Sequence, residues 1–233
     1  TSIYFFVNNN TCYRSSYASS MGTLGTGVGF LENSKVFFTG VDAGTYDAVV
    51  ADPVNSSAAG TLNALTTGGT LTNVATLPGG IDGAAAWLNG RLFIPYNGSI
   101  YNSTLNNVLT GYTDFVTPER SPDIIQSLIT HHDHIVAFGV NSMEFFYDSG
   151  VTPGSPLRRR NDVFYHLGLV DLNAWSVSKD VCYFVAQGDK GDVALYELNN
   201  FQVRPISDDR FNRWLTQRWN ANPHSFVVET FPY

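Results

Sequence analysis

The chain has 233 residues and a formal net charge of −7, with only 13 Lys and Arg side chains. So few basic residues argue against a protein that reads nucleic acid, because binding to phosphates requires clustered positive charge. Charged residues make up 14% of the sequence, against about 25% in typical proteins, which indicates wide subunit contacts or an extracellular β protein. No apolar stretch approaches the ~18 residues of a membrane helix, so no membrane insertion is expected.

Short apolar runs, rich in β-branched and aromatic residues, recur along the chain and predict strands. Their centres lie 43 to 56 residues apart, at Phe37, Phe93, Val136, Phe184 and Val227. One four-stranded propeller blade takes roughly 40 to 50 residues. After a turn rich in Gly, Asn or Asp, second runs follow at 46–51, 99–102, 143–147 and 193–198. These hairpins predict an all-β chain, an incomplete β-propeller with about four to five visible blades. A non-repetitive sandwich is the alternative.

The two ends of the chain differ in regularity. Residues 1–84 are predicted to form one or more divergent blades, with Gly/Ser/Thr-rich insertions in the segment 54–83. Residues 225–233 resemble an opening strand with no partner after it, and an unpaired apolar edge promotes aggregation. We therefore expect residues 1–233 to be a single propeller fragment of a longer chain.

One short helix is expected after the fourth blade hairpin, over residues 207–215, with Ser207 as its N-cap. The apolar residues on its predicted inner face are Phe211, Trp214 and Leu215. This face is expected to pack on the outside of a blade. A weaker helical turn is expected over residues 121–128, where a proline lies near the first turn.

The only cluster of basic residues is Arg158, Arg159 and Arg160, in a loop-like segment that follows Pro156. Three adjacent arginines favour a solvated turn or an ion-pair site with a neighbouring subunit over contact with DNA. They are the candidate interface or DNA-proximal residues. The residues expected to form the blade core are Phe93, Val136, Phe138, Phe184, Val185 and Trp175.

Candidate chemistry is sparse. The segment 131–134 contains three histidines, of which His132 and His134 would share one face of an extended strand. A third zinc ligand at a fixed spacing is missing, so a polar strand entry is favoured over a zinc site. Cys12 and Cys182 form no disulfide framework, although a bridge between them stays open. We assign no catalytic residue, no metal ligand and no cofactor.

An enzyme is the minority interpretation. Glycosidases use paired carboxylates, whereas those of this chain, such as Glu119, Glu144, Asp171 and Glu197, are scattered. The alternative function is a carbohydrate-binding or glycan-cleaving propeller with a groove lined by Trp87, Tyr96 and Tyr101. A secreted adhesion domain is a third hypothesis.

The order of several motifs resembles the packaged-DNA stabilisation proteins of short-tailed bacteriophages (podoviruses), also called tail hub or nozzle proteins. The motifs upstream are 89–93, 100–103, 122–125, 134–139 and 142–146. Those downstream are 156–160, Gly168, Trp175, the 181–196 hairpin, 203–207, the helix that ends at Leu215, and 224–232. The resemblance covers residues 85–232 and leaves residues 1–84 unaligned.

The resemblance implies a structural protein of the virion tail, assembled in the cytoplasm of the host bacterium. Such a protein forms a homo-oligomeric ring, a hexamer by the resemblance, below the portal and adaptor proteins. It extends the DNA channel, helps to retain packaged DNA, permits transient passage of double-stranded DNA, and anchors the tail needle, fibres or spikes. The family has no catalytic residues to carry over.

Overall fold

The computed structural model describes residues 81–118, 123–223 and 226–230, together with the side chain of Leu62 and the backbone of seven strands within residues 2–73. The seven strands are β1 (Ser2–Val7), β2 (Thr11–Ser16), β3 (Gly22–Thr26), β4 (Lys35–Phe37), β5 (Tyr46–Asp52), β6 (Thr61–Thr66) and β7 (Leu71–Asn73). They pair as two antiparallel sheets, β1–β3 and β4–β7.

Three further antiparallel sheets follow. The third contains β8 (Ala86–Leu88), β9 (Arg91–Tyr96), β10 (Ser99–Thr104) and β11 (Asn107–Val116). The fourth contains β12 (Ile125–His131), β13 (His134–Gly139), β14 (Met143–Asp148) and β15 (Leu157–Tyr165). The fifth contains β16 (Leu167–Leu169), β17 (Trp175–Ser178), β18 (Val181–Gly188), β19 (Val193–Asn199) and β20 (Gln202–Pro205), followed by the helix α1 (Asp209–Ala221).

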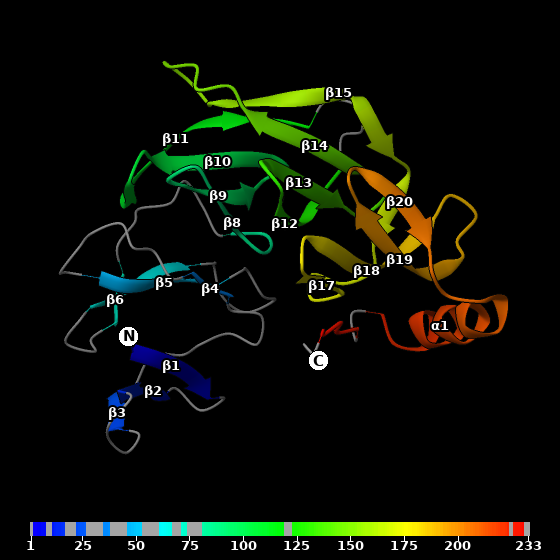
Figure 1. The fold of residues 1–233 in the computed structure, drawn as a ribbon, viewed down its shortest axis with the longest axis horizontal. Helices are drawn as coiled ribbons and strands as arrows, with labels where there is room; N and C mark the ends of the chain where they lie inside the picture. The colour runs from blue at the N-terminus through cyan, green and yellow to red at the C-terminus, as the bar shows by residue number, and fades with distance from the viewer. Residues whose placement is uncertain are drawn as a thin grey trace.

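In the first four sheets, strands that pair are also neighbours in the sequence, so each of these sheets is a meander. In the fifth sheet β16 and β17 pair with opposite ends of β18 and together act as one interrupted strand. Figure 1 shows the sheets following one another around an open arc. A series of four-stranded meanders is the architecture of propeller blades, and the predicted all-β propeller is confirmed.

Tight turns explain the registers of the hairpins. Asn97 and Gly98 connect β9 to β10, and both residues have positive φ, 48° and 71°. This is the conformation of a two-residue type I′ turn, for which Asn-Gly is the preferred sequence. The predicted hairpins are present as β4–β5, β9–β10, β13–β14 and β18–β19.

The core lies between facing sheets. Phe138 of β13 and Phe184 of β18 are both fully buried, with ring centroids 5.0 Å apart. Phe93, Val136 and Val185 are also buried, and Trp175 is half-buried against the same core as Phe184. A single sheet cannot bury both its faces, so contacts between neighbouring sheets supply most of the apolar burial.

The helix α1 differs from its prediction in three respects. Its N-cap is Asp208, whose Oδ1 accepts a hydrogen bond from the Phe211 N–H at 2.7 Å, and it continues six residues beyond Leu215. Ser207 instead accepts a hydrogen bond from the Leu195 N–H at 2.9 Å, which occupies its hydroxyl. Leu215 is buried, whereas Phe211 and Trp214 are exposed.

Three other expectations were wrong. Residues 125–128 belong to strand β12 instead of a helical turn, because they pair with β13. The arginines 158–160 lie in strand β15 instead of a loop, because β15 pairs with β14. Residues 226–230 form no strand; the Val228 N–H donates to the Asn173 carbonyl at 3.1 Å, so the segment lies along the fifth sheet.

Candidate interaction surfaces

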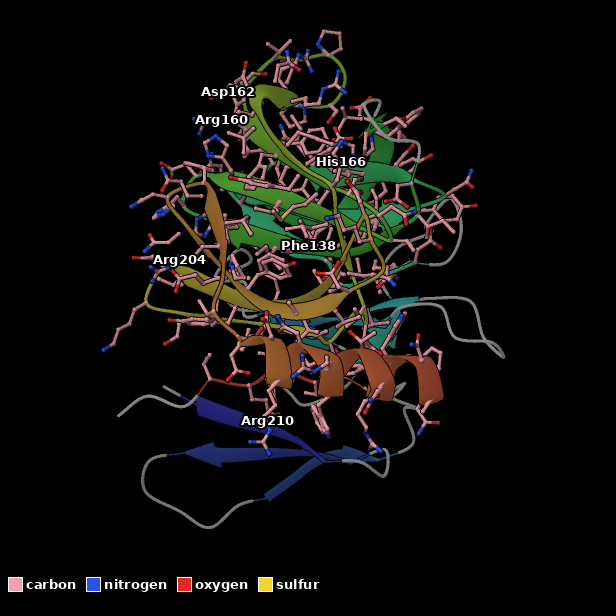
Figure 2. The ribbon with its side chains drawn as sticks, turned by 90° about the vertical axis from the view of Figure 1, so that its right-hand side faces the viewer. Phe138, Arg160, Asp162, His166, Arg204 and Arg210 are labelled. Atoms are coloured by element: carbon pink, nitrogen blue, oxygen red, sulfur yellow. The ribbon has the colours of Figure 1, made fainter. Side chains whose placement is uncertain are left out.

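The three arginines of β15 are held by groups of their own chain. Arg158 donates from Nη1 to the carbonyls of Ser155 and Leu157, both at 2.8 Å. Arg159 Nη1 lies 3.6 Å from Glu144 Oε2, and Arg160 Nε lies 3.0 Å from Asp162 Oδ1. Figure 2 labels Arg160 and Asp162 on this strand. Intramolecular partners account for this cluster, and its contact with a neighbouring subunit or with DNA stays a prediction.

A cluster of rings joins the fourth and fifth sheets. Phe201, in the turn between β19 and β20, has a left-handed backbone with φ of 63°. Its ring contacts His131, His132 and His134 of the β12–β13 hairpin, with centroid distances of 5.7, 6.0 and 4.6 Å. The guanidinium of Arg160 lies over the same ring, 4.2 Å from its centroid. The contacts place the β19–β20 turn against the neighbouring blade, and the strained backbone is consistent with this role.

Two histidines of this cluster, His131 and His134, lie in surroundings that favour the neutral imidazole. His131 is 1% exposed, and neither of its ring nitrogens has a hydrogen-bond partner. Burial, reinforced by the nearby His132, lowers the pKa of His131 to about 4, although Asp180 opposes this shift. Burial and Arg160 also lower the pKa of His134, opposed by Asp133 and Asp162.

We expect the chain to lose stability on mild acidification. The unfolded chain binds a proton at residue 131 below pH 6.5, while the folded chain resists it until about pH 4, so stability falls as the pH drops through this window. The loss from His131 should reach about 2 kcal/mol at pH 5. Urea unfolding at pH 7 and pH 5 measures it, and His131→Phe should reduce the difference between the two pH values. The matched control is His166→Phe, at an exposed histidine of the same chain. An equal effect of both substitutions would contradict the assignment.

The histidines of residues 131–134 were considered as zinc ligands in the sequence and interpreted as a polar strand entry. Among the residues that the structure describes, no group of three or more His, Cys, Asp or Glu side chains could hold a metal ion. Cys182 is a free thiol buried in strand β18, and burial raises its pKa. The side chain of Cys12 lies outside the described residues.

The carboxylates considered for glycan cleavage serve structural roles. Glu144 is 2% exposed and faces Arg159, while Glu197 forms an ion pair with Arg204. Asp171 is buried and accepts a hydrogen bond from the Asn173 N–H at 2.9 Å. Glu119 lies outside the described residues. An aromatic group is present on the third sheet, where Tyr101 lies 5.8 Å from Tyr96 and 5.0 Å from Phe115.

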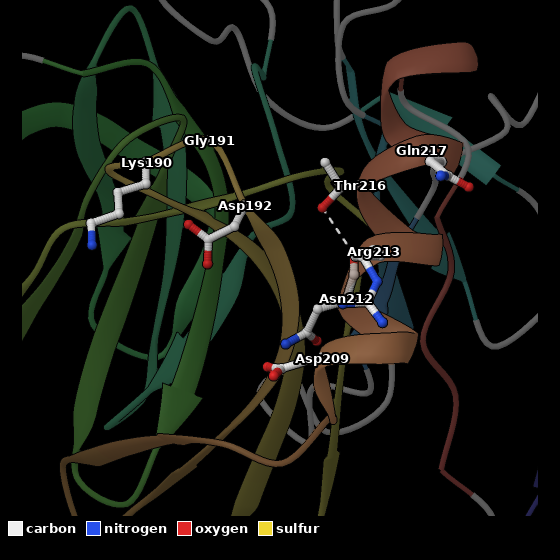
Figure 3. A pocket seen from close by; sticks show the side chains of 8 residues that line it. All are labelled: Lys190, Gly191, Asp192, Asp209, Asn212, Arg213, Thr216 and Gln217. Carbon is white, nitrogen blue, oxygen red and sulfur yellow. Dashed lines mark hydrogen bonds between the residues drawn. The ribbon is translucent and has the colours of Figure 1, made fainter.

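A groove of about 560 Å³ separates α1 from the β18–β19 turn, as Figure 3 shows. Its lining residues are Lys190, Gly191, Asp192, Asp209, Asn212, Arg213, Thr216 and Gln217. Thr216 anchors the helix, because its hydroxyl accepts from the Val193 N–H at 3.0 Å and donates to the Asn212 carbonyl at 2.9 Å. The groove carries two acidic and two basic side chains. This balance gives no net charge with which to select a ligand.

The outer side of α1 is the surface that sequence reasoning missed. Phe211 and Trp214 are 43% and 51% exposed, and their rings stack with centroids 5.5 Å apart. Arg210 lies on the side of the helix turned away from β18 and β19 (Figure 2). The signal was available in the sequence, because the helical period places Arg210, Trp214 and Arg218 on one face.

The fold and its surfaces define a propeller scaffold, in which the buried rings pack between sheets and the charged side chains of β14, β15, β19 and β20 form ion pairs within the chain. The chain belongs to the phage stabilisation family described as Bacteriophage P22 Gp10, beta-propeller, whose model matches residues 48–233. The match includes residues 48–84, which had stayed outside the resemblance based on motifs. The protein is therefore a structural, DNA-stabilising protein of a bacteriophage.

The other comparisons add little. No curated protein matches the chain. Among solved structures, the AfRom2 CNH domain is similar over 82% of this chain and 75% of that chain, with 10% sequence identity and a TM-score of 0.39. A likeness this distant carries no argument about function. In the part of the chain that the structure describes, no helix has the length and apolar character needed to span a bilayer.

Proposed function

We propose that this chain is a tail hub, or nozzle, subunit of a short-tailed phage. Several copies form a ring below the portal and adaptor, the ring extends the DNA channel, and its outer surface anchors needle, fibre or spike proteins. The observation that carries the proposal is the match to the phage stabilisation family over residues 48–233, which fold as successive antiparallel sheets. We propose the virion tail as its location and the host bacterial cytoplasm as the place of assembly.

Two physical features support this role. A ring subunit needs two different contact faces, and the low share of charged residues, 14%, suits surfaces that meet other subunits. The net charge of −7 suits a conduit, because a polyanion passes an acidic or neutral wall without adhering. The glycan-cleaving alternative would require accessible paired carboxylates, whereas Glu144 is buried against Arg159.

Particles assembled without this chain should package DNA and then lose it. Retention requires closure of the channel below the portal, which the absent ring would supply in this proposal. The fraction of filled heads, counted by electron microscopy after incubation with nuclease, measures the effect, and supplying the intact chain in trans should restore it. Particles that keep their DNA and complete tails without the chain, or density for the chain outside the tail, would overturn the proposal.

A further inference from the structure

The outer face of α1 is a basic and aromatic surface, which we call the α1 face and define by Arg210, Phe211, Trp214 and Arg218. The inner side of the helix is occupied, since Leu215 is 3% exposed and Trp219 packs on the core of the fifth sheet. The four residues of the α1 face are exposed. The helix therefore has one side held by its own blade and one side turned to solvent.

The α1 face has unused binding capacity. No ion pair joins Arg210 or Arg218 to any residue that the structure describes. The stacked pair of Phe211 and Trp214 is apolar area left in water, which is unfavourable at about 25 cal/mol per Å². Arginine and aromatic residues are the types most enriched at the energetic centres of protein interfaces. Such a face fits a partner surface with carboxylates around an apolar centre.

The net negative charge of the chain makes a second copy a partner of this kind. The chain as a whole carries −7, so without the two arginines the rest of it is more negative still. Copies of the chain repel each other on average, and a basic face on each copy supplies the attraction that a specific contact needs. In a closed ring each copy presents one face and receives a different one. The α1 face can serve as the presented face, and the acidic remainder of the next copy as the receiving one.

We propose that the α1 face docks onto an acidic surface of a second copy of this chain. The inference rests on the proposed ring function and deepens it by naming one of the two contact faces. In the contact the arginines pair with carboxylates, and the stacked rings of Phe211 and Trp214 leave water. A contact of this composition weakens as salt rises, because screening reduces the ionic part.

Sedimentation velocity of the full chain over a range of concentrations tests this proposal. Arg210→Glu together with Arg218→Glu reverses the charge of the face, and Trp214→Gln removes its largest apolar group. Each variant should raise the concentration of half-assembly about tenfold or more. The matched controls are the exposed Phe115→Ala and Lys179→Glu, which lie on other sheets or turns and should assemble like the wild type. Circular dichroism of each variant confirms the fold, which exposed substitutions should preserve.

The outcomes separate this inference from the ring function. Folded α1-face variants that assemble like the wild type overturn the docking inference and leave the ring proposal intact. Assembly that strengthens on raising the ionic strength from about 0.05 M to about 0.5 M also overturns it, because the contact would not be ionic. A wild-type chain that stays monomeric at all concentrations and binds no tail component overturns both proposals.

Discussion

Replacing Phe138 by alanine should lower the free energy of unfolding by about 3 to 5 kcal/mol. Phe138 is fully buried, and its ring meets that of Phe184 at 5.0 Å across the boundary between the fourth and fifth sheets. The substitution removes apolar burial and leaves a cavity at a joint that both sheets line, and backbone pairing on each side limits how far the cavity can collapse.

Urea unfolding at pH 7, followed by tryptophan fluorescence, measures this loss. The matched control is Phe115→Ala, because Phe115 is 52% exposed in strand β11 and its loss leaves no buried cavity. The control should change the unfolding free energy by less than about 1 kcal/mol. Equal effects of the two substitutions would mean that Phe138, at the boundary between the sheets, contributes no more to the free energy of unfolding than the exposed Phe115.

The strands were predictable because their signal is local. Apolar and β-branched runs of four to six residues, separated by turns rich in Gly, Asn or Asp, specify hairpins without reference to the rest of the fold, as for β9 and β10. The repeat of hairpins then predicted stacked blades. The loop predicted at residues 158–160 was wrong because strand β15 depends on pairing with β14, and the buried Glu144 that faces Arg159 comes from that partner strand.

Long-range contacts also explain the errors in the helix. Ser207 is a good N-cap by type, but strand β19 uses its hydroxyl, and Asp208 takes the cap instead. The predicted inner face was Phe211, Trp214 and Leu215, and of these only Leu215 is buried. The helix continues to Trp219, which packs on the core next to Leu215, and a helix ended at Leu215 lacks this residue.

The candidate surfaces were less predictable than the fold. The histidines of residues 131–134 were recognised as a polar strand entry, but the ring that they surround, Phe201, comes from a turn in the next blade. The three adjacent arginines are a visible cluster in the sequence, and in the structure they bind carbonyl and carboxylate groups of their own chain. The α1 face was not predicted as a surface, because its residues are spaced along a helix and form one surface only when the helix packs on its blade.

Replacing Gly168 by alanine should destabilise the chain by about 3 kcal/mol or more, by forcing two blades apart. Gly168 of β16 lies against the end of β13, where a Cβ atom would come within 1.6 Å of the Val140 carbonyl oxygen. The obstructing atom belongs to the backbone, so relief requires movement of a whole strand end. A single added methyl group thus tests how closely the fourth and fifth sheets must approach.

Thermal and urea unfolding of Gly168→Ala should be compared with Gly188→Ala in the same sheet. At Gly188 the nearest atom to an added Cβ is Asp192 Oδ1 at 3.3 Å, the end of an exposed side chain that can rotate away. Both substitutions reduce the backbone freedom of the unfolded chain alike, so the difference between them isolates the clash between blades. If Gly168→Ala were as stable as Gly188→Ala, the two sheets would have to be further apart than the structure places them.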